Sequence, residues 1–199
     1  MRPLVLFVAA GLLCGTCVAA PAATFQIDPA HTSAEFAVRH LMVSKVRGQL
    51  GKVTGTVDVD EADPTKSSVE ATIDVTGINT REPKRDEHLK SPDFFDVTKY
   101  PTITFKSKKI TKLADGRFQM TGDLTIHGVT KEVALDVEGS PIPFKDPMGH
   151  MKLGGSATTR LNRKDFGILW NKSLDGGGVV VSDDVDVTID IELVKMGAS

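Results

Sequence analysis

The sequence has little cysteine, and what it has lies near the start of the chain. Its 2 cysteines are Cys14 and Cys17. A chain without cysteine after residue 17 forms no disulfide there, offers no thiolate ligand to zinc or an iron–sulfur cluster, and has no cysteine nucleophile. These kinds of chemistry are therefore excluded for the rest of the protein.

An excess of charge of either sign is also missing. The formal net charge is -2 at pH 7, and the isoelectric point is about 6.2. A protein that binds nucleic acid needs an excess of lysine and arginine to neutralise phosphates, so we expect no nucleic-acid partner. With 40% hydrophobic and 25% charged residues, the composition is that of a globular protein rather than a disordered chain.

Only the N-terminus contains a long hydrophobic run. This run, from Leu4 to Val18, follows Arg2 and precedes Ala20-Pro21-Ala22, which is the order of a secretory signal peptide and its cleavage site. It is shorter than the roughly 20 apolar residues of a membrane-spanning helix. We therefore expect residues 1–22 to be a cleaved signal peptide, residues 23–199 to form one domain, and the mature protein to be periplasmic or secreted.

Motifs of catalysis and metal binding are absent as well. The sequence has no G-x-S-x-G elbow, no S-x-x-K, no phosphate-binding P-loop and no H-E-x-x-H, which excludes several common hydrolase and nucleotide-binding mechanisms. The 5 histidines are scattered and form no close pair with the spacing of metal ligands. We therefore expect a binding protein rather than an enzyme, without a cofactor and without a metal site.

What the sequence does have is an alternation of apolar and polar residues. From Val185 to Leu193 every second residue is apolar, and aspartate, threonine and glutamate lie between. Successive side chains of a strand point to opposite faces, so this segment has one apolar and one polar face. A helical period of 3.6 fits none of the alternating segments. The others span 34–38, 53–59, 69–75, 103–105, 118–126 and 133–137.

About eight strands of this kind, separated by turn residues, predict an all-β protein. The turns include Ala114-Asp115-Gly116 and His127-Gly128, which combine residues that favour tight turns. A sheet with one apolar face either closes into a barrel or stacks on a second sheet, and the periodicity alone does not distinguish these architectures. About eight strands is the size at which a closed barrel holds side chains or one small ligand.

One charged segment, residues 80–92, interrupts the strands. Pro83 suits the first turn of a helix, and Pro92 ends it, because proline is tolerated only where its missing N–H is not needed. The segment therefore predicts one short surface helix between two strands.

Three cationic side chains are candidates for binding a polar group. His40 continues the apolar face of the first predicted strand, so it either fixes one end of a ligand in an apolar pocket or is a core histidine bonded to a backbone carbonyl. Arg85 and His88 share one helix face by their spacing and are suited to a phosphate or carboxylate. Alternatively, they belong to a solvated face paired with Asp86 and Glu87.

Several longer motifs follow one another over essentially the whole of residues 23–199. They are His31-Thr32-Ser33, Phe36-Ala37-Val38-Arg39-His40-Leu41, Arg85-Asp86-Glu87-His88-Leu89-Lys90-Ser91-Pro92-Asp93-Phe94-Phe95, Lys99-Tyr100-Pro101-Thr102-Ile103-Thr104-Phe105, Gly122-Asp123-Leu124-Thr125-Ile126-His127-Gly128-Val129-Thr130 and Lys164-Asp165-Phe166-Gly167. In this order they resemble the motifs of the YceI-like family of polyisoprenoid-binding proteins.

This resemblance implies a fold and a ligand. The family fold is an extended, lipocalin-like antiparallel β-barrel whose apolar interior takes a long lipid chain. The resemblance implies an isoprenoid or related amphiphile as ligand, with an isoprenoid quinone or a polyprenyl phosphate among the possibilities. It also implies export, a possible homodimer and a possible membrane partner of the cytochrome b561 type.

A barrel that holds a lipid tail needs an apolar lining, because burying the tail removes apolar area from water. By parity, the residues expected to line it are Phe36, Val38, Val57, Ile73, Ile103, Phe105, Met120, Leu124, Leu135 and Ile189. The alternative is that they fill a dry core, as in a partner-binding β-domain with an exposed apolar patch. A lipid-modifying enzyme would instead place an inward carboxylate near His40.

Overall fold

A computed structural model describes residues 22–140, 142–175 and 177–197. The predicted signal peptide lies outside these ranges apart from its last residue, and the structure therefore does not test it. Among the described residues, no helix is long and apolar enough to cross a membrane.

The described residues form eleven strands and one α-helix. The helix is α1 (Pro83–Lys90), and short 3₁₀ turns lie at Pro64–Lys66, Val75–Gly77 and Arg163–Phe166. The strands are β1 (Ala23–Ile27), β2 (Ser33–His40), β3 (Ser44–Gln49), β4 (Val53–Val59), β5 (Ser68–Asp74), β6 (Thr102–Ala114), β7 (Arg117–Ile126), β8 (Val129–Gly139), β9 (Phe144–Lys145), β10 (Met151–Asn162) and β11 (Asp184–Lys195).

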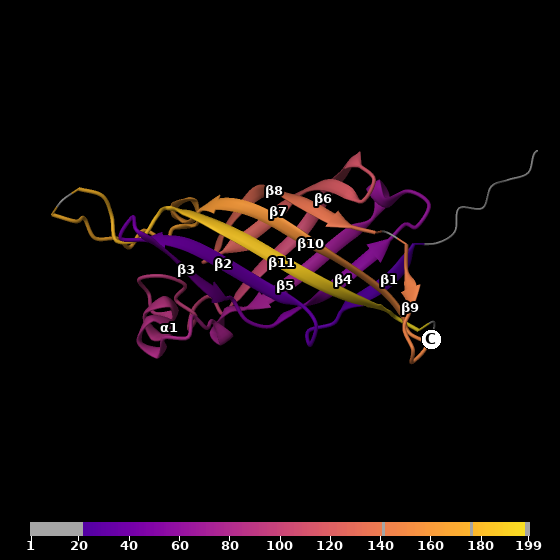
Figure 1. The fold of residues 1–199 in the computed structure, drawn as a ribbon, viewed down its shortest axis with the longest axis horizontal. Coiled ribbons are helices and arrows are strands. Elements are labelled where there is room, and N and C mark those ends of the chain that lie inside the picture. The colour runs from indigo at the N-terminus through magenta and orange to yellow at the C-terminus, as the bar shows by residue number, and fades with distance from the viewer. Residues whose placement is uncertain (1–21, 141, 176, 198–199) are drawn as a thin grey trace, which may run out of the picture.

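Eight of the strands close into an antiparallel barrel, which confirms the predicted lipocalin-like fold. The order around the barrel is β11-β1-β4-β5-β6-β7-β8-β10, and β10 pairs with β11 to complete it. The closing pair is long, with a register from Lys152 opposite Val194 to Asn162 opposite Asp184. Figure 1 shows these two strands side by side along the barrel.

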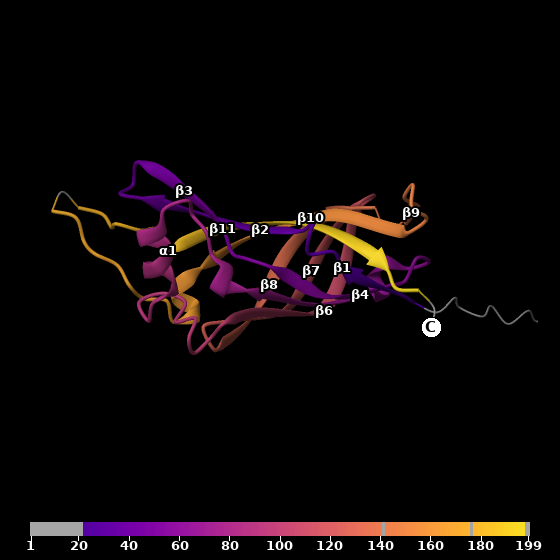
Figure 2. The same ribbon diagram turned by 90° about the horizontal axis from the view of Figure 1, so that it is seen from below.

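The other edge of β11 is shared between two partners. Its C-terminal part pairs with β1, and residues Asp186 to Asp190 pair with β2. The hairpin of β2 and β3 therefore extends the wall beyond β1 and β4, toward the end of the molecule where α1 lies (Figures 1 and 2). The short β9 lies near the opposite end, beside the C-terminus (Figure 1).

Strand alternation places the apolar side chains inside the barrel. Phe25, Ile27 and Val75 are almost completely buried and belong to one hydrophobic cluster. Other inward residues, such as Val187 and Ile189, are only partly buried because they border internal space rather than packed side chains. The barrel is therefore hollow in part.

The predicted helix and turns match the structure. Helix α1 begins at Pro83 and ends at Lys90, two residues before Pro92. His127 and Gly128 form a two-residue hairpin between β7 and β8, and their φ angles of 51° and 75° are those of a type I′ turn. The alternation of apolar and polar residues does not predict β1, β3, β9 and β10.

Candidate ligand-binding site

Two adjoining cavities lie inside the barrel. The cavity nearer α1 has a volume of about 230 Å³, and the other has a volume of about 260 Å³. We call them the helix-end cavity and the barrel cavity. Both are lined almost entirely by apolar side chains. They share the lining residues Leu50, Ile103, Ile126, Leu161 and Val187.

The two cavities together are elongated along the barrel. Leu153 and Leu161, both on β10, lie at opposite ends of the stretch of this strand that lines the barrel cavity. These residues are eight positions apart, which corresponds to about 26 Å of strand at roughly 3.3 Å per residue. The helix-end cavity continues from Leu161 toward α1. The space therefore suits a long, narrow apolar ligand.

The structure places all ten predicted lining residues on the walls of these cavities. Phe36 and Val38 line the helix-end cavity, and Ile103 lines both. The other seven line the barrel cavity: Val57, Ile73, Phe105, Met120, Leu124, Leu135 and Ile189. Their contact with a lipid stays a prediction, but they surround a void rather than a filled core.

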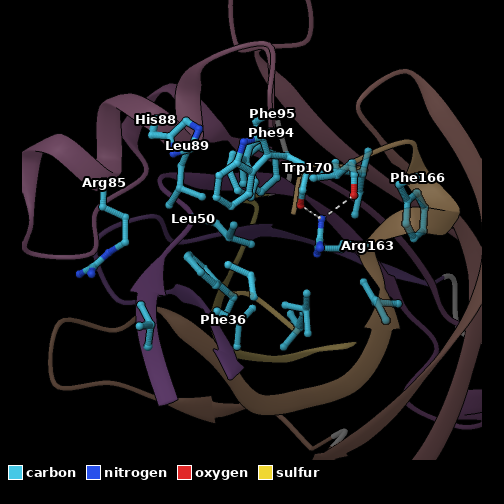
Figure 3. Close-up of a pocket in the computed structure, with 18 of the residues that line it drawn as sticks. Phe36, Leu50, Arg85, His88, Leu89, Phe94, Phe95, Arg163, Phe166 and Trp170 are labelled. Carbon is cyan, nitrogen blue, oxygen red and sulfur yellow. Dashed lines mark hydrogen bonds between the residues drawn. The ribbon is translucent and has the colours of Figure 1, made fainter. Parts of the chain in front are cut away.

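The three predicted polar residues all border the helix-end cavity. His40 is the last residue of β2 and lies between Ser44 on β3 and Val181. The imidazole of His88 contacts the Asp93 carboxylate, with 2.9 Å between Nε2 and Oδ2. Arg85 is half-buried, and Figure 3 shows its guanidinium directed away from the labelled aromatic side chains.

Among the described residues, neither Asp86 nor Glu87 forms the ion pair with Arg85 or His88 that the alternative interpretation contained. Arg85 donates to Thr80 instead, from Nε to Oγ1 at 2.7 Å and from Nη2 to the backbone oxygen at 3.0 Å. Asp86 also bonds to Thr80 and accepts from its N–H at 2.8 Å. The buried Thr80 connects the preceding loop to the start of α1. Its N–H donates to Asp86, and its hydroxyl and backbone oxygens accept from Arg85.

Arg163 is a buried charge in the wall that no pattern in the sequence predicts. Only 6% of it is exposed, and burial lowers the pKa of its guanidinium. It donates to the backbone oxygens of Ile168 at 2.7 Å, Trp170 at 2.8 Å and Ser182 at 3.0 Å, and to the Asp183 carboxylate at 3.1 Å. Arg163 therefore holds two chain segments together (Figure 3).

Aromatic side chains after α1 and β10 complete the helix-end cavity. The rings of His88 and Trp170 meet edge to face at 4.9 Å, and Phe94 lies 5.2 Å from Trp170. Phe95 and Phe166 line the same cavity (Figure 3). One signal in the sequence could have identified these aromatic residues. Phe166 belongs to the motif Lys164-Asp165-Phe166-Gly167, and Ile168 and Trp170 continue an alternation of apolar residues after it.

The charge of the lining differs between the two cavities. Among the described residues, the side chains that line the helix-end cavity include four cationic or titratable bases and no carboxylate. They also include no serine, threonine or cysteine that a neighbouring base might activate. The barrel cavity has serine and threonine hydroxyls and Glu138 at its wall, and Glu138 is paired with Arg117 at 3.4 Å. The helix-end cavity is thus the side that suits a polar or anionic group.

A cluster of Asp28, His31 and Glu192 lies elsewhere in the structure. The hydrogen bond from His31 lowers the pKa of Asp28, and Nδ1 of His31 lies 2.9 Å from Oδ2 of Asp28. The ammonium of Lys152 contacts Glu192 and lies 3.8 Å from Asp28, and Glu192 raises the pKa of Lys152. A lysine cation therefore already offsets the negative charge of this cluster.

A closed antiparallel barrel around an apolar cavity defines a lipocalin-like class of protein. The chain matches the YceI-like domain over residues 25–193. A UPF0312 protein of Staphylococcus aureus is 41% identical over 162 residues, which cover 81% of this chain and 91% of the relative. A UPF0312 protein of Vibrio cholerae is 40% identical over 152 residues, which cover 75% and 80%. The protein belongs to the YceI-like domain family.

Solved structures support the same fold. The Campylobacter jejuni YCEI protein has a TM-score of 0.66 and 32% identity, and the match covers 80% of this chain and 90% of that one. Burkholderia cenocepacia BcnA has a TM-score of 0.71 with 21% identity and coverage of 83% and 98%. A polyisoprenoid binding domain from Saccharophagus degradans has a TM-score of 0.62, 13% identity and coverage of 88% and 99%.

Proposed function

We propose that this protein is an exported carrier of a long-chain isoprenoid or a related amphiphilic lipid, held in the two cavities. The observation that carries the proposal is the pair of adjoining apolar cavities along the barrel, which share five lining residues. Burial yields about 25 cal/mol per Å² of apolar surface, so a tail that hides a few hundred Å² gains on the order of several kcal/mol. The YceI-like family and the name of the Saccharophagus degradans relative support an isoprenoid tail.

The lipid has a defined orientation in this proposal. Its tail lies in the barrel cavity, and its polar head lies in the helix-end cavity near His40, Arg85 and His88. The charge difference between the cavities supports this orientation, because a low-dielectric site favours opposite charges in proximity. A polyprenyl phosphate and an isoprenoid quinone both have a suitable head.

One matched pair of variants tests the carrier function. Ala157 lines the barrel cavity, whereas Thr158, the next residue of β10, is exposed. Ala157→Phe should fill part of the cavity and weaken binding of a long prenyl alcohol at least about tenfold, since the lost tail burial is worth more than 1.4 kcal/mol. Thr158→Phe should leave binding unchanged.

Binding is measured by titration with the prenyl alcohol, and native mass spectrometry of protein purified from cells shows whether a lipid is retained. We expect a lipid adduct on the wild type and on Thr158→Phe, and a reduced one on Ala157→Phe. Thermal denaturation checks that both variants are folded. Equal binding of the prenyl alcohol by the two folded variants would contradict a tail bound in the cavity.

A further inference from the structure

The tip of the β2–β3 hairpin exposes three consecutive large apolar residues. Leu41 is 39% exposed, Met42 54% and Val43 79%. Single exposed apolar residues are normal on a protein surface, but a contiguous group marks a site of interaction.

The conformation of this tip makes its sequence more unusual. The His40 carbonyl accepts from the Val43 N–H at 3.1 Å, and the two residues between have φ angles of 50° for Leu41 and 62° for Met42. Positive φ at both central positions is the geometry of a type I′ turn, which favours Asn-Gly. Leucine and methionine are strained there. Their presence indicates a requirement other than folding.

The tip lies at the end of the helix-end cavity. The Leu41 N–H donates to the Val180 oxygen at 2.9 Å, and His40 bridges to Val181. His40, Val180 and Val181 all line the cavity. In Figure 1 this hairpin and α1 occupy the same end of the molecule. Whatever the tip contacts therefore comes close to the part of the site where the lipid head is proposed to lie.

Basic residues surround the apolar tip. By register, Arg39 lies opposite Lys45, and Arg47 follows on the same outer face of the hairpin, because paired residues share a face. Lys45 pairs with Asp186 at 3.2 Å. In the part of the chain that the structure describes, Arg39 and Arg47 form no ion pair, and the same is true of Lys172, which is exposed on the adjoining loop.

We propose that the β2–β3 tip docks on an anionic lipid bilayer. The apolar side chains enter the interfacial region, and Arg39, Arg47 and Lys172 contact the anionic headgroups, as in other interfacial anchors. Asp175 on the same loop as Lys172 and Asp184 at the start of β11 are exposed acids, and the three basic residues Arg39, Arg47 and Lys172 outnumber these two. Docking presents the helix-end cavity to the membrane. The proposal does not depend on which ligand the cavity binds.

The opposite end of the barrel supplies a matched control. Ile142, Phe144 and Met148 are exposed there, so this end also has apolar surface. Lys145 lies between them, and the neighbouring Asp146 is paired with His150 at 3.2 Å. This end therefore lacks the excess of basic residues and is expected not to dock.

The test is flotation of the protein with vesicles of phosphatidylcholine alone or mixed with phosphatidylglycerol. Wild type should bind the mixed vesicles and bind phosphatidylcholine vesicles far more weakly. Leu41→Asn with Met42→Gly removes two of the three apolar side chains of the tip while supplying the residues that the turn favours. It should reduce binding to mixed vesicles by about tenfold or more without lowering the melting temperature.

Two further double variants complete the experiment. Arg39→Gln with Arg47→Gln should reduce binding about 25-fold, at about fivefold for each basic residue near an anionic surface. Ile142→Asn with Met148→Asn should bind like wild type. Unchanged binding by both tip variants, or loss of binding in the Ile142 and Met148 variant, would overturn the proposal.

Two controls distinguish membrane docking from oligomerisation through the tip and from lipid binding in the barrel cavity. If the tip variants alter the oligomeric state in light scattering while wild type binds no vesicles, the tip joins copies of this chain and the membrane proposal is wrong. The Ala157→Phe variant, which impairs the barrel cavity, should bind vesicles like wild type. Failure of lipid binding in the cavity and failure of docking are therefore distinguishable.

Discussion

At the scale of single residues, Arg163 stands out because it is a charged side chain in a buried position. Its guanidinium is buried and donates four hydrogen bonds, three of them to backbone oxygens of the segments around Ile168, Trp170 and Ser182. These acceptors lie in several directions. Among side chains, only the planar guanidinium of arginine offers enough N–H donors in a fixed arrangement to reach them all. This residue positions the wall of the helix-end cavity and uses four of its five N–H donors within the protein.

Replacing Arg163 should therefore destabilise the protein strongly. Arg163→Leu leaves buried acceptors unsatisfied and should lower the free energy of unfolding by about 3–5 kcal/mol. Arg160→Leu is the control, because Arg160 is 67% exposed and pairs with Asp186 at the surface. Its loss should cost at most about 1 kcal/mol. Urea unfolding at neutral pH measures both values, and similar costs would contradict the role of Arg163.

Arg85 is the second residue with a testable role. Arg85→Ala should weaken binding of a prenyl phosphate by a factor that corresponds to about 1.5–3 kcal/mol, the value of a hydrogen bond to a charged group. The uncharged prenyl alcohol of the same length should bind almost as before. Lys84→Ala is the control, since Lys84 is exposed on α1 and does not line the cavity.

Titrations with the two ligands check this prediction, and unfolding of each variant is measured alongside because Arg85 also bonds to Thr80. Equal loss for phosphate and alcohol, or no loss for either, would show that Arg85 belongs only to the anchoring of the helix.

At the scale of elements, the segment from β10 to β11 is fixed by one carboxylate. The hydrogen bond from Lys164, assisted by Arg163, lowers the pKa of Asp183. Lys164 lies 2.8 Å from this carboxylate. The ionised form of Asp183 therefore stabilises the fold, since it holds both cations at the end of the segment.

The stability that Asp183 contributes should depend on pH in one direction. Its folded-state pKa is depressed, so its contribution is complete above the ordinary aspartate pKa of about 4 and is lost as the pH falls through the lower folded-state value. Asp183→Asn should therefore be less stable than wild type at neutral pH, and the difference should shrink below pH about 4. The measurement is urea unfolding over a pH series.

The exposed Asp175, which forms no ion pair within the described residues, provides the comparison. Asp175→Asn should change stability little at neutral pH. The difference in the free energy of unfolding between wild type and Asp183→Asn should not stay constant down to strongly acidic pH. A constant difference would contradict stabilisation by the ionised Asp183 carboxylate.

Elements differ in how well the sequence predicts them. The sequence predicts the start and the approximate end of helix α1, because Pro83 favours a first helical turn and Pro92 cannot continue the helix. Strand β10 was missed because Gly154-Gly155-Ser156 interrupts the apolar alternation in its middle. Glycine carries no side-chain pattern, and its place in the barrel depends on pairing with β11 and β8.

At the scale of the whole molecule, closure of the barrel and export are separate properties. Strand β1 begins at Ala23, and this residue already pairs with Val59 of β4. If residues 1–22 are a signal peptide, the exported protein should begin at Ala23 or Thr24 and keep the whole barrel. N-terminal sequencing of the protein from the periplasm or medium checks this. An exported form that keeps Met1, or one with a lipid on Cys17, would contradict it.

The order of residues along the chain settles which face of most strands is apolar, because side chains alternate on a strand whatever the fold. All ten residues selected by parity accordingly lie on the walls of the cavities. The position of α1 in the chain and the turn at His127-Gly128 were equally local properties.

That these inward side chains enclose a space instead of filling it follows from the three-dimensional arrangement of the barrel. That outcome depends on the circumference of the closed barrel and on which side chains face one another across it, and neither is a local property of the chain. The buried Arg163 and the aromatic side chains around Trp170 belong to the site for the same reason. They come from loops and turns, where no periodicity marks the direction of a side chain.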